Sequence, residues 1–231
     1  MKKNLFWFSI QLIFLLFSFV HCTLPVSYVY NDMSWRCGGK TNAELVGNLV
    51  KNNILKSKIG EQAMLLTDRA HYVPQEIKSQ AYDDNPLYLG YGATISAPHM
   101  HAYALEYLAP HIKDKSNILD VGSGSGYLTS CLARMTPNGK AFGIEHIDEL
   151  VKFSIENANN DDINLIKSGK VSFQVVSGFD GLASNAPYDA IVCKIVSTYL
   201  PYCYNLSFLT KYQPVHIACW CCSSIYTRSI N

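Results

Sequence analysis

The stretch that decides the fold is Ile118-Leu119-Asp120-Val121-Gly122-Ser123-Gly124-Ser125-Gly126, which runs directly into Tyr127. Its first four residues form an apolar run that is typical of a buried parallel strand. The glycines let the backbone turn tightly and approach a ligand closely before a helix opens at Tyr127. This order of strand, glycine turn and helix predicts a cofactor site at the carboxyl end of the strand.

An acidic residue at the end of the next strand extends this pattern. The run Ala141-Phe142-Gly143-Ile144 ends in Glu145, whose carboxylate can accept hydrogen bonds from both hydroxyls of a ribose. Tyr127 stands where a dinucleotide fingerprint needs its third glycine or alanine, and the loop lacks the Lys-Ser/Thr pair of a phosphate-binding P-loop. The pattern therefore favours S-adenosyl-L-methionine. The alternative is a plain strand-to-helix turn with Glu145 as a solvated strand end.

Short β-rich runs and helical patterns alternate in the second half of the chain. They cover Asn117 to Val121, Tyr127 to Met135, Lys140 to His146, Asp148 to Ala158, Val171 to Val176 and Tyr188 to Val192. Such alternation predicts an α/β protein with a mostly parallel sheet and helices on both faces. We expect the Rossmann-like fold of S-adenosylmethionine-dependent methyltransferases, with its C-terminal strands missing or altered.

Two helix starts are marked upstream of the glycine loop. Thr41-Asn42-Ala43-Glu44 fits a capping box, in which Thr41 caps the Glu44 amide and the Glu44 carboxylate returns the bond. Ser96-Ala97-Pro98 predicts an N-cap at Ser96, a proline in the first turn and a helix over His99 to Leu108. An N-cap at Ser96 would lie where helix amide groups favour a carboxylate.

Between Ala63 and Tyr91, prolines, glycines and tyrosines interrupt the helical pattern. This composition predicts a loop with short helical turns, of the kind that often carries substrate contacts. Asp68 and Arg69, which are adjacent in this loop, are expected to form a surface ion pair.

The composition limits the classes of partner. A length of 231 residues with 48% hydrophobic content suits one domain with a buried core, and 19 basic against 18 acidic residues leave a net charge of +1. No whole-chain field therefore draws the protein to nucleic acid or to an anionic membrane. Cys219-x-Cys221-Cys222 has no second pair at zinc-finger distance. We expect a monomer with no metal and no nucleic-acid partner.

The two ends of the chain differ from its middle. Lys2 and Lys3 precede an apolar run from Leu5 to Val20, which predicts a signal peptide over residues 1–22. A linker over 23–40, a methyltransferase domain over 41–191 and a divergent C-terminal tail over 192–231 then follow. Translation from Met1 implies the secretory pathway or secretion, with no membrane contact after signal cleavage. Translation from Met33 implies a cytoplasmic protein.

Several further motifs carry a resemblance to a known family. They are Thr67-Asp68-Arg69-Ala70-His71-Tyr72, Ala93-Thr94-Ile95-Ser96-Ala97-Pro98-His99-Met100-His101, Gly143-Ile144-Glu145-His146-Ile147 and Ala186-Pro187-Tyr188-Asp189-Ala190-Ile191. With the glycine loop, they make the chain similar to the protein-L-isoaspartate (D-aspartate) O-methyltransferases from about Met33 to Ile191. The resemblance implies methyl transfer from S-adenosyl-L-methionine to the free carboxylate of L-isoaspartyl and D-aspartyl residues in damaged proteins and peptides, which serves protein repair.

The resemblance also implies the residues of the site. Ser96 corresponds to the family's active-site serine, so it is the expected catalytic residue. The expected cofactor-binding residues are Ala93, Thr94, Ile95, Ser96, His101, Asp120, Gly122, Ser123, Gly124, Glu145, His146, Asp180 and Gly181. The residues taken alone leave another interpretation open, in which Ser96 only caps its helix and His101 is a packed core histidine.

The sequence departs from the family pattern in two places. Ser177-Gly178-Phe179-Asp180-Gly181 stands where the family has Gly-Asp-Gly and a longer loop, and the glycine-rich continuation that follows Ile191 in the family is missing. The second departure predicts a sheet that stops near Ile191 and exposes an apolar edge. The alternatives to the enzyme are a non-catalytic cofactor-binding relative, an inactive truncated isoform and a small-molecule methyltransferase.

Overall fold

A computed structural model of the chain describes residues 37–178, 180–194, 215–221 and 224–230, the last two ranges as backbone. Their helices and strands follow in the order α2 (Asn42–Lys51), α3 (Lys58–Leu66), η2 (Arg69–His71), η3 (Gln75–Gln80), β1 (Leu87–Gly90), β2 (Ala93–Ile95), α4 (Pro98–Leu108), β3 (Asn117–Val121), α5 (Tyr127–Met135), β4 (Lys140–Glu145), α6 (Asp148–Lys167), β5 (Val171–Val175), η4 (Ala183–Asn185), β6 (Ala190–Cys193), β7 (Val215–Cys221) and β8 (Ser224–Ile230).

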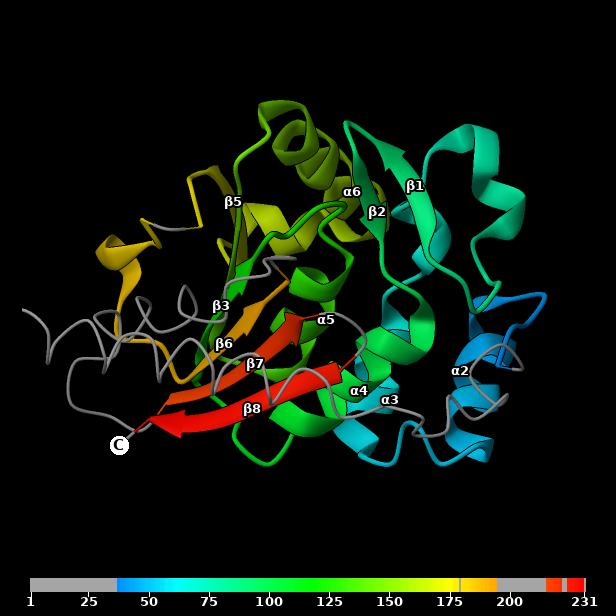
Figure 1. The fold of residues 1–231 in the computed structure, drawn as a ribbon, viewed down its shortest axis with the longest axis horizontal. Helices are drawn as coiled ribbons and strands as arrows, with labels where there is room; N and C mark the ends of the chain where they lie inside the picture. The colour runs from blue at the N-terminus through cyan, green and yellow to red at the C-terminus, as the bar shows by residue number, and fades with distance from the viewer. Residues whose placement is uncertain (1–36, 179, 195–214, 222–223, 231) are drawn as a thin grey trace, which may run out of the picture. The chain divides into compact units, whose positions relative to one another are not determined.

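The centre of the fold is a sheet with the strand order β5-β4-β3-β6-β7-β8 (Figure 1). β3 pairs in parallel with β4 on one side and with β6 on the other, so that Leu119 lies opposite both Phe142 and Ile191. β4 also pairs in parallel with β5. Strand order therefore reverses beside β3, and ligands of open α/β sheets bind at such a switch point. The expected parallel α/β architecture is confirmed.

The C-terminal tail contributes two strands to this sheet. β7 pairs in parallel with β6, from Ala190 opposite His216 to Cys193 opposite Cys219, and β8 pairs antiparallel with β7. The expectation of an exposed edge near Ile191 is therefore wrong, because β7 covers that edge. The tail lacks the family's glycine-rich turn, but its run Val215–Cys221 contains the β-branched and aromatic residues that suit a strand.

Successive side chains of β3 point to opposite faces of the sheet and pack into two hydrophobic clusters. Ile118 belongs to the larger hydrophobic cluster, which also contains residues of α2 to α6. Leu119 and Val121 belong to a second cluster, to which Leu182 and Tyr188 contribute from the segment between β5 and β6. β3 is thus enclosed on both sides, as its continuous apolar sequence predicts.

The N-terminal part of the described chain consists of short helices and a hairpin. α2 begins as expected, because the Glu44 amide donates to the Thr41 hydroxyl over 3.2 Å. The Glu44 carboxylate, however, accepts from the Lys40 amide at 2.9 Å instead of returning the bond to Thr41. The expected loop over 63–91 contains part of α3 and the 3-10 helices η2 and η3. It leads into the hairpin of β1 and β2, after which Ser96 joins the hairpin to α4.

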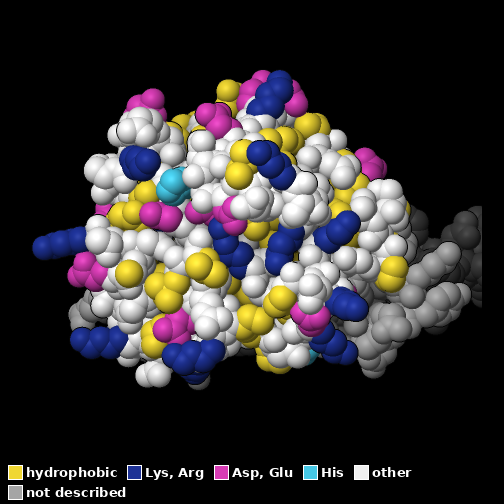
Figure 2. Space-filling view, turned by 180° about the vertical axis from the view of Figure 1, so that it is seen from behind, with side chains coloured by type: hydrophobic (Ala, Val, Ile, Leu, Met, Phe, Trp, Pro, Cys, Tyr) yellow, Lys and Arg dark blue, Asp and Glu magenta, His cyan; other side chains and the backbone are white. Residues whose placement is uncertain are grey.

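The surface and the ends add two observations. Lys, Arg, Asp and Glu side chains share the face opposite to that of Figure 1 (Figure 2), so this face carries both signs of charge. In the part of the chain that the structure describes, no helix has the length and apolar character needed to cross a membrane. The predicted signal peptide and most of the linker lie outside the described residues, and the predicted domain boundaries stay a prediction.

Candidate active site

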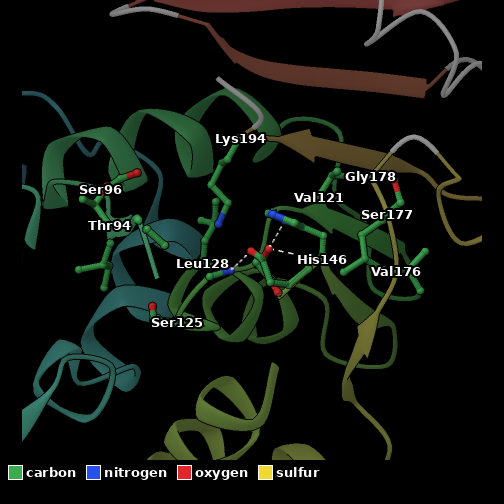
Figure 3. Close-up of a pocket in the computed structure, with 18 of the residues that line it drawn as sticks. Thr94, Ser96, Val121, Ser125, Leu128, His146, Val176, Ser177, Gly178 and Lys194 are labelled. Atoms are coloured by element: carbon green, nitrogen blue, oxygen red, sulfur yellow. Dashed lines mark hydrogen bonds and ion pairs between the residues drawn. The ribbon is translucent and has the colours of Figure 1, made fainter. Parts of the chain in front are cut away.

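A pocket of about 580 Å³ lies at the carboxyl ends of the parallel strands (Figure 3). This volume is in the range of sites that take small molecules and cofactors. The lining residues come from four segments: the hairpin strand β2 with the start of α4, the glycine loop with α5, the ends of β4 and β5, and the end of β6. They are Gly92, Ala93, Thr94, Ile95, Ser96, His101, Val121, Gly122, Ser123, Gly124, Ser125, Leu128, Ile144, Glu145, His146, Val176, Ser177, Gly178 and Lys194.

Backbone hydrogen bonds fix the glycine loop to the neighbouring strand. The amides of Gly122 and Ser123 both donate to the carbonyl of Ile144, at 2.9 and 3.0 Å. The Gly126 amide donates to the carbonyl of Ser123 at 3.0 Å, which closes the turn before α5 begins. These bonds hold the backbone of the loop at the pocket wall, where the sequence predicts a close approach to a ligand.

The carboxylate of Glu145 is buried at the pocket wall and is held by the backbone. Its Oε2 accepts from the Gly124 amide at 3.2 Å, and its Oε1 accepts from the amides of His146 and Ile147 at 2.8 and 3.4 Å. The His146 ring lies against the same carboxylate, with Nδ1 at 2.7 Å from Oε1, while 74% of the His146 side chain remains exposed. Glu145 is thus placed as a fixed acceptor at the strand end, where the sequence predicted a ribose contact.

Asp120 lies behind the pocket wall and does not line the pocket. Its side chain is fully buried, and Oδ2 accepts from the Thr129 hydroxyl at 2.7 Å. The ammonium of Lys194 lies 3.1 Å from Oδ1 and 3.2 Å from Oδ2 of the same carboxylate. The role of Asp120 in holding the cofactor stays a prediction; the structure pairs Asp120 with Lys194, a pocket-lining residue that the sequence did not predict.

Ser96 lines the pocket, but it does not cap α4. The helix starts at Pro98, its N-cap is Ala97, and no side chain caps it. The prediction of Ser96 as N-cap was wrong because the residue before a proline is held out of the helical region, which places the cap at Ala97. The Ser96 hydroxyl therefore makes no capping hydrogen bond. The backbone carbonyl of Ser96 accepts from Arg69 Nη2 at 2.8 Å.

Arg69 is fully buried, so the predicted surface ion pair with Asp68 is wrong. Asp68 instead accepts from the Tyr82 hydroxyl at 2.9 Å and caps η2. The guanidinium of Arg69 contacts the carbonyl of Ser96, and its Nη1 lies 3.4 Å from His101 Nδ1. The short helix η2 turns the Arg69 side chain inward, and burial lowers its pKa to about 10, so it remains cationic at neutral pH.

His101 stands at the wall between Arg69 and the pocket. Its side chain is buried, and its ring centroid lies 4.9 Å from that of Tyr127. Burial holds the pKa of His101 well below 6.5, and the nearby charges of Arg69 and Lys194 act in the same direction. The pocket therefore meets a neutral imidazole at this point.

The structure brings most of the predicted site residues together. Those that line the pocket are Ala93, Thr94, Ile95, Ser96, His101, Gly122, Ser123, Gly124, Glu145 and His146. Asp180 is exposed and Gly181 is buried, and neither lines the pocket; Val176, Ser177 and Gly178 do so at the end of β5. In the described part of the chain, no group of three or more His, Cys, Asp or Glu residues could hold a metal ion.

The reversal of strand order beside β3, the glycine loop after it and the acid at the end of β4 define a Rossmann-like methyltransferase fold. The sequence profile of the protein-L-isoaspartate(D-aspartate) O-methyltransferases (PCMT) matches residues 40–205. The chain belongs to this family.

Similar proteins from distant organisms support this assignment. The chain is 44% identical to the protein-L-isoaspartate O-methyltransferase of Caenorhabditis elegans over 160 residues, and this aligned region covers 69% of each protein. It is 44% identical over 152 residues to protein-L-isoaspartate O-methyltransferase 1 of Arabidopsis thaliana, 65% of each. The crystal structure of the beta-aspartate methyltransferase of Plasmodium falciparum in complex with S-adenosyl-L-homocysteine aligns with a TM-score of 0.68 at 28% identity, over 83% of this chain and 95% of that one.

Proposed function

We propose that this chain transfers the methyl group of S-adenosyl-L-methionine to the free carboxylate of L-isoaspartyl and D-aspartyl residues in damaged proteins. The observation that carries the proposal is that the Ser96 segment, the glycine loop and Glu145 line one pocket. The Plasmodium falciparum relative, which shares this fold, holds S-adenosyl-L-homocysteine, the compound that remains after the methyl group has left.

The residues present fit such a cofactor. Glu145 offers carboxylate oxygens to ribose hydroxyls, and the backbone of Gly122 to Gly124 allows close approach of a nucleoside. Asp120 supports this wall from behind through Lys194. When bound, the cofactor supplies an electrophilic methyl group on a sulfonium.

The acceptor needs no general base. An isoaspartyl α-carboxylate has an ordinary pKa of about 3.5, so it is already ionised at neutral pH. The Ser96 hydroxyl is free of capping and can donate to this carboxylate, while Arg69 holds the Ser96 backbone in place. Catalysis then consists of alignment of the carboxylate with the methyl group and of exclusion of water.

Methyl transfer to a defined peptide tests this function. We expect base-labile methyl ester on a peptide that contains L-isoaspartate and none on the same peptide with ordinary aspartate. Ser96→Ala should lower kcat/KM roughly 10- to 100-fold, which is the worth of one hydrogen bond to a charged group. Ser184→Ala, at an exposed serine outside the pocket, serves as the matched control.

A second outcome favours the non-catalytic relative. If the protein binds S-adenosyl-L-homocysteine but forms no ester on the isoaspartyl peptide, the enzyme proposal fails. If methyl esters form on a small-molecule carboxylate and on neither peptide, the proposed isoaspartyl acceptor is wrong.

The compartment and the oligomeric state belong to the same proposal. We propose that use of Met1 directs the chain to the secretory pathway with loss of residues 1–22, and that use of Met33 leaves it in the cytoplasm. Sequencing the N-terminus of the protein isolated from its host distinguishes these outcomes. We also propose a monomer, which light scattering of the purified protein tests.

A further inference from the structure

Lys194 holds an unusual position for a lysine. It follows β6, whose residues Ala190–Cys193 are all buried, and its own side chain is only 13% exposed. Its amide donates to the carbonyl of Val121 at 3.0 Å, which fixes the backbone beside the glycine loop. Figure 3 shows the side chain extending from the end of β6 between Thr94 and Ser96 on one side and His146 on the other. A lysine at a solvated strand end would instead extend into water.

The ion pair with Asp120 orients this lysine. Both oxygens of the buried carboxylate contact the ammonium, and Thr129 supports the carboxylate from α5. Because Lys194 lines the pocket and Asp120 does not, the positive end of the pair faces the cavity and the negative end lies in the core. An ammonium has three donors, so it can serve a second acceptor while it keeps this carboxylate.

Other charged and titratable side chains lie at or behind the pocket wall. Glu145 supplies the negative charge at the end of β4. The imidazole of His101 is neutral, and the guanidinium of Arg69 contacts both this ring and the carbonyl of Ser96. Lys194 and Ser96 both line the pocket, and the cationic Arg69 lies directly behind Ser96, so this part of the wall suits an anionic ligand group.

We propose that Lys194 binds a ligand carboxylate in this pocket, with Asp120 as its positioning partner. The inference rests on the proposed function, in which two ligand groups carry such a carboxylate: the methionyl end of the cofactor and the isoaspartyl acceptor. Either group would form a charge-assisted hydrogen bond with the ammonium.

The test compares ligands with and without the carboxylate. Binding of S-adenosyl-L-homocysteine and of 5′-methylthioadenosine, which lacks the amino-acid end, is measured by calorimetry for the full chain and for Lys194→Met. Steady-state kinetics with the isoaspartyl peptide gives KM and kcat for the same proteins. Lys194→Arg keeps the charge, and Lys58→Met removes an exposed, ion-paired lysine outside the pocket as the matched control.

We expect Lys194→Met to lose about tenfold or more in affinity for one carboxylate ligand. Weaker binding of S-adenosyl-L-homocysteine with unchanged binding of 5′-methylthioadenosine identifies the cofactor carboxylate. Unchanged binding of both nucleosides with a KM for the peptide raised about tenfold identifies the acceptor. Lys194→Arg should retain most of the affected interaction, and Lys58→Met should match the unaltered protein.

Two results overturn the proposal. One is a Lys194→Met protein with unchanged affinity for S-adenosyl-L-homocysteine and unchanged KM, and the other is tighter binding of S-adenosyl-L-homocysteine after the lysine is removed. Lys194→Met leaves Asp120 buried without its cation, so the double variant Lys194→Met with Asp120→Asn is tested in parallel and should show the same loss if the single variant does not fold. Binding and turnover by the unaltered chain test the proposed function separately.

Discussion

Substitution of Gly126 by alanine should destabilise the fold at the junction of the glycine loop and α5. Gly126 has φ +85°, a left-handed conformation that costs other residues roughly 1–2 kcal/mol. An added Cβ would also lie 2.8 Å from Phe173 Cζ and 3.0 Å from Ser154 Cβ. Phe173 cannot retreat easily, because its ring also abuts Gly143. Such overpacking costs roughly 1–3 kcal/mol, so the expected total is roughly 2–5 kcal/mol.

Gly169→Ala separates the two contributions to this loss. Gly169 has a similar φ of +69°, but nothing lies within 4 Å of an added Cβ. Urea unfolding followed by circular dichroism should therefore show a loss of about 1–2 kcal/mol for Gly169→Ala and a clearly larger loss for Gly126→Ala. Equal losses in the two variants would refute the packing argument. A stable Gly126→Ala protein would refute the whole description of the loop.

Three further predictions concern buried charge and the pocket. Asp161→Asn should lower the free energy of unfolding by about 3–5 kcal/mol in urea, because it removes the negative charge 2.8 Å from Arg134, whose side chain is only 9% exposed; a loss below about 1 kcal/mol contradicts this. Burial lowers the pKa of His101, so in mildly acidic solution this histidine is protonated in the unfolded chain but not in the folded chain. Stability should fall as the pH drops below about 6.5, by up to about 1.4 kcal/mol per pH unit for this group, and His101→Asn should flatten that slope in urea titrations between pH 7.5 and 5.5. Glu145→Gln should weaken S-adenosyl-L-homocysteine about tenfold in calorimetry, because the amide offers one acceptor oxygen where the carboxylate offers two; unchanged affinity would exclude Glu145 as a ligand.

The parts of the fold that depend on local pattern could be predicted from the sequence. The apolar run before Gly122 and the acid at Glu145 lie on consecutive strands, and their order alone places them at one edge of a parallel sheet. The Thr41 cap was also predictable from local sequence, because the donor and the acceptor of its hydrogen bond are only three residues apart. The tail strand β7 was missed, because its pairing with β6 depends on a partner distant in sequence.

The errors at the site arise from contacts between distant segments. Asp68 and Arg69 are neighbours in sequence, yet the 3-10 turn sends one to Tyr82 and the other into the core. Lys194 could not be assigned a partner, since Asp120 is 74 residues away. A charge directly after a continuous buried strand was the available signal for this residue.

The hydrogen bonds of Glu145 have a consequence for ligand recognition. The same carboxylate that faces the pocket already ties the Gly124 amide to the amides that open α6, through protein contacts alone. The conformational entropy of ordering this wall is therefore lost when the chain folds, and little remains to be lost when a nucleoside arrives. A ligand would meet a rigid receptor surface, and its affinity would report direct contacts rather than loop closure.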